Sequence, residues 1–280
     1  MLAVCLVTGS LVAEAAAPAP QRVISINLCT DELVLTLADR NQLLSVSHLV
    51  QDPELSWFAA QARNIPANYG RAEEIVTLQP DLVVAGNFTA PATIALLKKL
   101  GIPVLQFAMP RTIEEVEAQI TVMARALGQI GRGAAVVADM QHRLASLPSL
   151  PLRGTPPTVA LYQPNGLGAA EGTLVHDVMT TAGMRNLAGM RSLADYAQLP
   201  MEVLLLDQPD LLVMIKDDSS APSLAQELLR HPALKKAFSA SRTVMMPPQA
   251  WSCGSPYVVR AVEILRDAAI ASIVTTLGAS

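Results

Sequence analysis

Two glutamates stand at the same position of a pattern that occurs twice in the chain. The stretch EEIVTLQPDLVV begins at Glu73 and EVLLLDQPDLLV begins at Glu202, so the two copies are offset by 129 residues. Because proline disfavours the helical conformation in the residue before it, each copy predicts a helix that ends before Pro80 or Pro209 and leads into a buried strand. Each glutamate then lies in the first helical turn, where the helix dipole stabilises a carboxylate by about 0.3 to 1 kcal/mol. This local effect alone accounts for an acid at that position.

Metal-ligating side chains are few. A bare zinc or manganese ion needs several histidine and carboxylate ligands that converge on one point. Of the four histidines, His48 alone falls on a loop expected at a ligand-binding edge, whereas His142 and His176 fall on predicted helices and His231 precedes a proline. The sequence therefore does not favour a site for a bare metal ion.

Aromatic and amide side chains gather at predicted loops. The chain has only two Trp, four Tyr and four Phe. Binding groups in open parallel sheets collect beyond the carboxyl ends of the strands, and aromatic faces there favour a large flat ligand. Core packing and loop capping are the alternatives for each residue. The candidate ligand-binding residues are Asn27, Tyr69, Asn87, Phe88, Tyr162, Gln163 and Trp251, while Trp57 and Phe58 are either ligand contacts or an anchor for a long loop.

Seven short runs rich in Val, Ile and Leu predict buried strands. Helical or loop segments separate them, which is typical of βαβ crossovers and a mostly parallel sheet. Because the scheme recurs with an offset near half the chain length, we expect an α/β protein of two lobes, each with a mostly parallel sheet flanked by helices. The runs begin at Arg22, Leu43, Asp81, Ile102, Thr158, Asp210 and Thr243.

A helical segment connects the two predicted lobes. Apolar residues follow a helical spacing from Ile113 to Leu127, and the spacing resumes from Val137 to Leu147 after a break expected at Gly131–Gly133. The predicted organisation is an N-terminal lobe over residues 18–128, a single long interlobe helix over 129–150 and a C-terminal lobe over 151–280. One stiff crossing implies little motion between the lobes.

The first 17 residues predict an export signal. An apolar run precedes Ala13-Glu14-Ala15, which fits a small-residue cleavage site, although no basic residue precedes the run. We therefore expect a periplasmic protein cleaved near Ala15. No later segment reaches about 18 apolar residues without a charge, the length that spans a membrane. The net charge of −4 argues against nucleic acid as a partner, because no basic excess exists to neutralise phosphates.

Export would leave Cys29 and Cys253 in an oxidising compartment. An even number of cysteines there favours a disulfide, and this one would join the two lobes. Spacing alone does not establish such a bond. Free thiols and ligation of a soft metal centre stay open as alternatives.

The order of these segments resembles the periplasmic substrate-binding proteins of ABC importers for iron complexes and vitamin B12. The resemblance rests on RVISINLCTDELVLTLA, GRAEEIVTLQPDLVVAG, MEVLLLDQPDLLVMI and AWSCGSPYVVRAVEIL, and it covers essentially the whole chain after the export signal. It implies two lobes joined by a long helix, with a metal chelate in the cleft between them and no intrinsic cofactor. Ferric siderophore, haem and cobalamin or another corrinoid are all open as the chelate. The two cysteines depart from the family's pattern and leave the ligand class undecided.

The resemblance also implies partners. Glu73 and Glu202 would point toward an ABC permease dimer with its ATPase and meet arginines there, with one lobe on each permease subunit. The binding protein itself is expected to be a monomer. Trp251 precedes the same Ser-Pro entry to the last helix as a cleft tryptophan in similar B12 binders.

Functions of other classes are the alternatives. A binder of a bare transition-metal ion would need more histidines at the cleft than His48. A periplasmic α/β enzyme is not favoured, because the chain contains no G-x-S-x-G, H-E-x-x-H, Walker or G-x-G-x-x-G motif. A binding module used for sensing or storage without a transporter is the third alternative. We therefore expect a transport protein rather than an enzyme.

Overall fold

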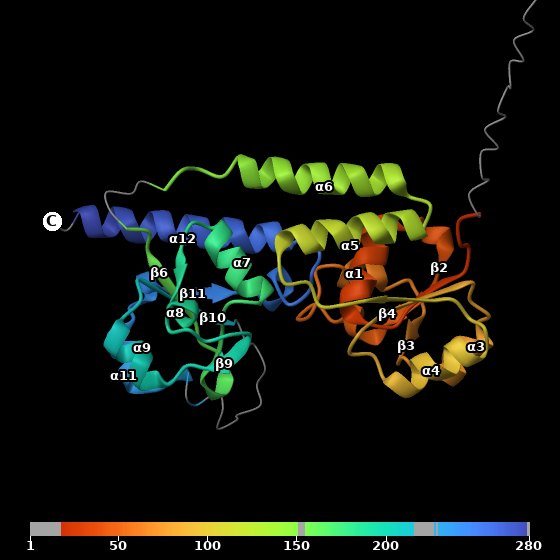
Figure 1. The fold of residues 1–280 in the computed structure, drawn as a ribbon, viewed down its shortest axis with the longest axis horizontal. Helices are drawn as coiled ribbons and strands as arrows, with labels where there is room; N and C mark the ends of the chain where they lie inside the picture. The colour runs from red at the N-terminus through yellow and green to blue at the C-terminus, as the bar shows by residue number, and fades with distance from the viewer. Residues whose placement is uncertain (1–17, 151–154, 216–226, 228, 279–280) are drawn as a thin grey trace, which may run out of the picture.

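Two sheets lie side by side along the molecule, each with helices around it (Figure 1). The computed structural model describes residues 18–150, 155–215, 227 and 229–278. The expected α/β architecture of two lobes is confirmed. The predicted export signal over residues 1–17, with its cleavage site near Ala15, lies outside the described residues.

The N-terminal lobe contains a five-stranded sheet of order β3-β2-β1-β4-β5, in which every neighbouring pair is parallel. The four strands predicted in this half are confirmed. The fifth, β3, has two residues, too few to show a strand period in the sequence. The strands are β1 (Val23–Ser25), β2 (Leu43–Ser47), β3 (Ala67–Asn68), β4 (Leu82–Gly86) and β5 (Val104–Phe107).

The C-terminal lobe contains a four-stranded parallel sheet of order β11-β10-β6-β8. A separate antiparallel pair, β7 with β9, accompanies it. The three strands predicted in this half are confirmed. The strands are β6 (Thr158–Leu161), β7 (Leu167–Ala169), β8 (Arg185–Asn186), β9 (Tyr196–Gln198), β10 (Leu211–Ile215) and β11 (Thr243–Met246).

The duplicated pattern folds in the same way in both lobes. Helix α3 (Ala72–Thr77) leads into β4, and helix α9 (Met201–Asp207) leads into β10. The residues before the two prolines, Gln79 and Gln208, have φ angles of 47° and 41°. Both have therefore left the right-handed helical region, which confirms the predicted helix ends.

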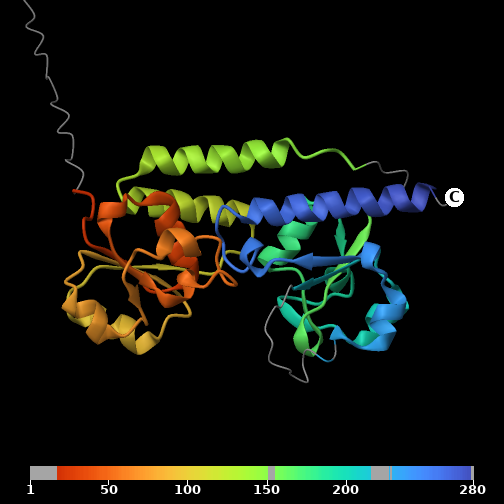
Figure 2. The same cartoon turned by 180° about the vertical axis from the view of Figure 1, so that it is seen from behind.

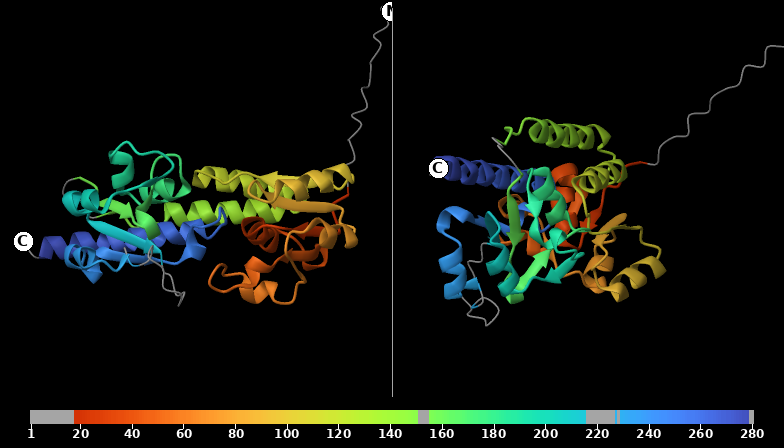
Figure 3. Two further views of the ribbon diagram at one scale, coloured as in Figure 1. Left: turned by 90° about the horizontal axis from the view of Figure 1, so that it is seen from below. Right: turned by 60° about the vertical axis from the view of Figure 1, so that its left-hand side comes forward.

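The connecting segment forms two antiparallel helices. Helices α5 (Ile113–Ala126) and α6 (Ile130–Ala145) pack along each other, and α6 carries the chain from the first lobe to the second (Figures 1 and 3). The turn between them lies at Gly128, whose φ is 73°. The break predicted at Gly131–Gly133 is wrong, because these residues lie inside α6. Glycine lowers helix stability but does not by itself end a helix.

The other helices flank the sheets, and α12 follows the line of α5 along the molecule (Figure 2). Arg143 of α6 pairs with Glu263 of α12 at 2.8 Å, which fixes the crossing helix to the second lobe. The remaining α-helices are α1 (Leu28–Leu37), α2 (Ala59–Ala62), α4 (Pro91–Lys99), α7 (Leu174–Thr181), α8 (Leu187–Met190), α11 (Pro232–Ala237) and α12 (Val258–Gly278), and short 3-10 helices span Arg40–Gln42, His48–Gln51, Pro164–Gly166, Ala240–Arg242 and Pro248–Ala250.

None of the helices in the described ranges has the length and apolar character needed to cross a bilayer. Within the same ranges, no three His, Cys, Asp or Glu side chains are grouped so that they could hold a metal ion.

Candidate ligand-binding cleft

The carboxyl ends of both parallel sheets face the junction between the lobes. Residues that follow β1, β4 and β5 meet residues that follow β11 on one side of this junction. Residues that follow β2 meet those that follow β6 and β11 on the other side. This edge is where open parallel sheets bind ligands. The interlobe junction, visible between the two sheets in Figure 2, is therefore the candidate cleft.

A small cavity of about 110 Å³ lies at the junction. Four of the predicted ligand-binding residues line it together: Asn27, Asn87, Phe88 and Trp251. Trp251 is 4% exposed and belongs to the second lobe, whereas Phe88 is 80% exposed and belongs to the first. The structure thus brings residues more than 160 positions apart in sequence to one cavity.

Asn27 also has a structural role at this cavity. Its side-chain oxygen accepts a hydrogen bond from the backbone N–H of Cys29 at 3.0 Å and so caps α1. Gly86, at the end of β4, lies so close that a Cβ there would meet the Asn27 side chain at 3.0 to 3.2 Å. A side chain at position 86 would therefore press on the Asn27 cap, so the capping geometry favours glycine there.

Tyr196 is a cavity residue that the sequence did not identify. It is 46% exposed and lines the cavity from the second lobe, across from Phe88. Partial burial raises the pKa of its phenol. Strand β9, which carries Tyr196, has three residues, too few to show a strand period in the sequence. Tyr196 lies shortly before Glu202, as Tyr69 lies shortly before Glu73, and this parallel is the signal that could have identified it.

Gln163 lines a different part of the junction. Gln163 and Trp57 both line a groove of about 570 Å³. In the same groove, the side-chain amide of Gln249 in the second lobe donates a hydrogen bond to the Pro53 carbonyl of the first lobe at 2.8 Å. The Trp57 ring packs edge-on against Tyr257 with centroids 4.7 Å apart, and Phe58 packs against the same ring at 5.3 Å. Trp57 and Phe58 therefore anchor their loop on the second lobe.

Tyr69 lies at the end of β3 and is 64% exposed. Its ring stacks on His48 with centroids 4.5 Å apart, and the Arg71 guanidinium lies 5.9 Å from the ring centroid. The hydroxyl of Thr93, on α4, donates to the carbonyl of the next residue, Gly70. Tyr69 thus projects at the carboxyl edge of the first sheet, beside the loop that leads from Phe88 into α4, although it does not line the 110 Å³ cavity.

Tyr162 does not lie at the interlobe cavity, contrary to the sequence-based expectation. It is 1% exposed and packs in a core cluster with Ala160, Leu204 and Leu212. Side chains alternate across a strand, so Ala160 and Tyr162 share the face of β6 that is covered within the second lobe. Burial, with a smaller effect from Glu202, raises the pKa of its phenol.

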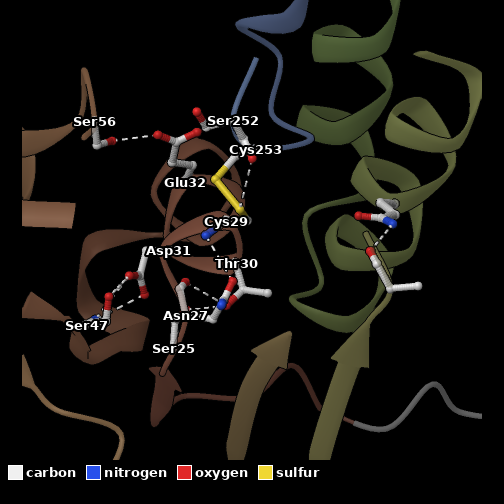
Figure 4. Close-up of a disulfide and its surroundings, with 12 residues drawn as sticks. Ser25, Asn27, Cys29, Thr30, Asp31, Glu32, Ser47, Ser56, Ser252 and Cys253 are labelled. Atoms are coloured by element: carbon white, nitrogen blue, oxygen red, sulfur yellow. Dashed lines mark hydrogen bonds between the residues drawn. A yellow bond between two sulfur atoms is a disulfide. The ribbon is translucent and has the colours of Figure 1, made fainter. Parts of the chain in front are cut away.

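Cys29 and Cys253 form a disulfide between the two lobes (Figure 4). Their Cα atoms lie 4.9 Å apart although 224 residues separate them in sequence. Cys29 is in the first turn of α1, half-buried, and lines the 110 Å³ cavity. Cys253 is 4% exposed and lies in the loop before α12.

Two buried carboxyl groups follow Cys29 on α1 and point in different directions (Figure 4). Asp31 accepts from the Ser47 backbone N–H at 3.1 Å and bonds to the Ser47 hydroxyl; burial raises the pKa of Asp31 to about 7, although these hydrogen bonds oppose the rise. Glu32 accepts from the Ser56 hydroxyl at 2.6 Å, and burial raises the pKa of Glu32 as well. Neither acid lines the 110 Å³ cavity or the 570 Å³ groove.

Glu73 and Glu202 are both exposed in the first turns of α3 and α9. The two helices lie in different lobes, on the side of the molecule opposite α6 (Figure 1). Each lobe thus presents an exposed glutamate at a helix start on this side.

Another groove, larger than the two at the junction, lies elsewhere. It has a volume of about 610 Å³ and is lined by Arg185, Arg191 and Asp207 among others, at the amino ends of β6 and β8. None of the predicted ligand-binding residues lines it.

A family model described as periplasmic binding protein matches residues 23–247. The chain belongs to the periplasmic binding protein family. Two curated proteins named cobalamin-binding protein, from strains of Halobacterium salinarum, are 28% identical over 198 residues, which is 69% of this chain and 53% of theirs. The chain therefore spans about half the length of the curated relatives it matches.

Solved structures of periplasmic binding proteins share the fold. The apo form of the periplasmic heme-binding protein RhuT from Roseiflexus sp. RS-1 has a TM-score of 0.73 and 24% identity, covering 89% of this chain and 99% of that one. The periplasmic vitamin B12 binding protein BtuF of Vibrio cholerae has a TM-score of 0.63 and 18% identity, covering 91% and 98%. The predicted family and two-lobe architecture are confirmed.

Proposed function

We propose that this chain captures a metal chelate in the periplasm and delivers it to an ABC importer. The chelate we favour is a flat tetrapyrrole, haem or a corrinoid. The observation that carries this proposal is the pair of exposed aromatic rings, Phe88 and Tyr196, which line one cavity from opposite lobes with Trp251 between the sheets. Aromatic faces on both sides of a crevice suit a broad flat ligand that is largely apolar.

Tyr69 supports the same ligand class. Its exposed phenol lies at the sheet edge with the Arg71 cation nearby. A tyrosine oxygen is one of the axial ligands that proteins use for haem iron, and an arginine suits the carboxylates of a haem. The names of the relatives, which include heme-binding and cobalamin-binding proteins, support the class without deciding between its members.

Delivery would use the side opposite α6. We assign Glu73 and Glu202 as permease-docking residues, because each stands exposed at a helix start, one in each lobe. Two equivalent acids suit a partner with twofold symmetry. Exposed ion pairs of this kind mainly steer and orient an encounter, and they make it sensitive to salt.

Titration of the purified apo protein tests the ligand class. We expect hemin or cyanocobalamin to quench the tryptophan fluorescence saturably and to change its own visible spectrum, and a ferric hydroxamate to do so weakly. Phe88→Ala and Trp251→Ala should each weaken the binding by about tenfold or more, since a buried aromatic contact contributes roughly 1.5 kcal/mol or more.

Leu100→Ala is the matched control, because it also removes an exposed apolar side chain, 53% exposed, at the end of α4 and outside the cleft. Its affinity should equal that of the unchanged protein. Equal affinity in all three variants would place the ligand outside this cleft, and absence of binding by both tetrapyrroles would refute the ligand class.

A further inference from the structure

The disulfide connects the lobes at a second point. The chain passes between the lobes through α6, which lies along the outer side of the molecule (Figure 1). The Cys29–Cys253 bond lies at the cavity instead, between α1 and the loop before α12. Two separated connections restrict rotation of one lobe against the other far more than one connection does.

The contact around this bond forms what we call the interlobe seam: residues 29–32 and 53–58 of the first lobe against residues 249–257 of the second. Its packing is tight at Gly254, where a Cβ would overlap the ring of Pro110. At its far side, Trp57 and Phe58 pack on Tyr257. That aromatic contact is apolar and does not depend on the disulfide.

The polar part of the seam next to the disulfide is buried. One oxygen of Glu32 accepts from the Ser56 hydroxyl, and Ser255 of the second lobe interacts with the same carboxyl group; both contacts lower the pKa of Glu32, but burial raises it more. Figure 4 shows the Glu32 carboxyl beside the Ser252–Cys253 segment. The Glu32 carboxyl group would regain water contacts if the seam opened, so its burial favours opening.

The cavity at the junction is also small. Its volume of about 110 Å³ is below the range of roughly 300–1,000 Å³ that is typical of small-molecule sites. Entry of a large flat ligand therefore requires the lobes to part at this cavity, with the aromatic contact and the α5–α6 helices as the pivot. The disulfide is the bond that such a movement would strain first.

We propose that the Cys29–Cys253 disulfide is a redox-sensitive latch that holds the interlobe seam closed, and that its reduction by a dithiol lets the lobes part at the cavity. The coupling to ligand binding rests on the function proposed above. The parting of the lobes after reduction does not depend on that function.

The geometry sets the order of the chemical steps. A thiolate of the dithiol attacks Sγ of Cys29, because Cys29 lines the cavity whereas Cys253 is 4% exposed. The S–S bond breaks, a mixed disulfide forms at Cys29, and Cys253 leaves as a thiolate that takes up a proton. The second thiol of the reductant then displaces Cys29, which also takes up a proton. The protein ends with two thiols and the reductant with one disulfide.

Hydrogen exchange of the full mature chain, measured by mass spectrometry with and without dithiothreitol, tests the latch. We expect faster exchange of the backbone amides in residues 28–33 and 252–257 after reduction, and unchanged exchange in α5 and α6. The double variant Cys29→Ser/Cys253→Ser should show the fast exchange without reductant and should not respond to dithiothreitol. This variant separates loss of the bond from any other effect of the reductant.

Unchanged exchange in both segments after verified reduction would overturn the latch. Faster exchange throughout the chain would overturn it too, because the bond would then stabilise the whole fold rather than the seam. Brief reduction followed by iodoacetamide gives a second readout: the trapped intermediate should carry the reductant on Cys29 and the alkyl group on Cys253, and an intermediate with the reductant on Cys253 would contradict the order of attack.

Ligand titrations of the oxidised and reduced protein test the coupling. With hemin and cyanocobalamin as probes, the affinity should change by about tenfold between the two redox states, within the usual range for coupled sites. Binding that is identical in both states would overturn the coupling even if the seam moves. If neither probe binds in either state, the proposed function fails while the exchange experiment still decides the latch.

Discussion

Asp31 is the residue whose protonation should be visible in the stability of the protein. Its side chain is buried at the end of β2 and its pKa is raised to about 7 by burial, from 3.8. Between these pH values the folded state holds a proton that the unfolded state has lost. Stability contributed by this group is therefore greatest at low pH and falls as the pH rises toward 7.

We predict that Asp31→Asn reduces the loss of unfolding free energy that occurs as the pH rises toward 7. The three-unit difference in pKa corresponds to roughly 4 kcal/mol of unfolding free energy between about pH 4 and pH 7. An asparagine keeps an oxygen for the Ser47 N–H and an NH₂ for the Ser47 hydroxyl, so the variant should fold. Urea unfolding at pH 5 and pH 8 measures the difference.

Asp267→Asn is the matched control, because Asp267 is an exposed aspartate on α12. This variant should have the same pH dependence of the unfolding free energy as the unchanged protein. A variant Asp31→Asn with the same loss of stability between pH 5 and pH 8 as the unchanged protein would show that Asp31 does not titrate in this range.

At the scale of helices, the turn between α5 and α6 depends on one glycine. Gly128 has a φ of 73°, and a Cβ there would meet the Cβ of Ala19 at 2.6 Å. We predict that Gly128→Ala lowers the unfolding free energy by about 1 kcal/mol or more, because the left-handed conformation and the contact both oppose a side chain. Chemical denaturation at one pH measures this.

Gly131 provides the opposite case within the same segment. It lies in the first turn of α6 with nothing within 4 Å of an added Cβ. Gly131→Ala should therefore raise the unfolding free energy by about 0.5 to 1 kcal/mol through better helix propensity. A loss of stability in this variant would support a helix break at Gly131, as the sequence alone had indicated.

The difference between Gly128 and Gly131 shows which helices and strands the sequence could predict and which it could not. Short runs rich in Val, Ile and Leu predicted seven strands, and the proline of each repeat predicted a helix end, because both signals are local. The sequence does not say which of Gly128, Gly131 and Gly133 turns the chain, because a helix tolerates glycine and only the packing of α6 on α5 decides. Strands of two or three residues, such as β3 and β9, carry too little pattern to be predicted.

The candidate site shows the same limit. Trp251, Phe88, Asn87 and Asn27 were predictable because they follow recognisable strands whose carboxyl ends share one edge. Tyr162 follows such a strand too, but its place in the alternation turns it into the core. Tyr196 is brought to the cavity by β9, whose pairing with β7 is a long-range contact that no local pattern encodes.

At the scale of the whole molecule, the exposed acids of the two lobes should act together. We predict that Glu73→Arg/Glu202→Arg abolishes import of the ligand while the affinity for the ligand stays unchanged, because both acids lie outside the cleft cavity. Uptake by cells that depend on this protein, compared with titration of the purified variant, measures the two effects separately.

Glu114→Arg is the control for charge, since Glu114 is an exposed glutamate in the first turn of α5. It should leave import intact. Equal loss of import in this variant would mean that net charge rather than position matters, and loss of ligand affinity in the double variant would contradict a role in docking.

The lobes are covalently tied twice, by α6 and by the disulfide, and the ligand is expected where their sheets face each other. A crystal structure of the protein with hemin or cyanocobalamin bound tests this most directly. We predict that the macrocycle lies between the lobes, against Phe88 of the first and Tyr196 of the second, with Trp251 in contact. A macrocycle bound elsewhere, for example in the groove lined by Arg185 and Arg191, would contradict the proposed cleft.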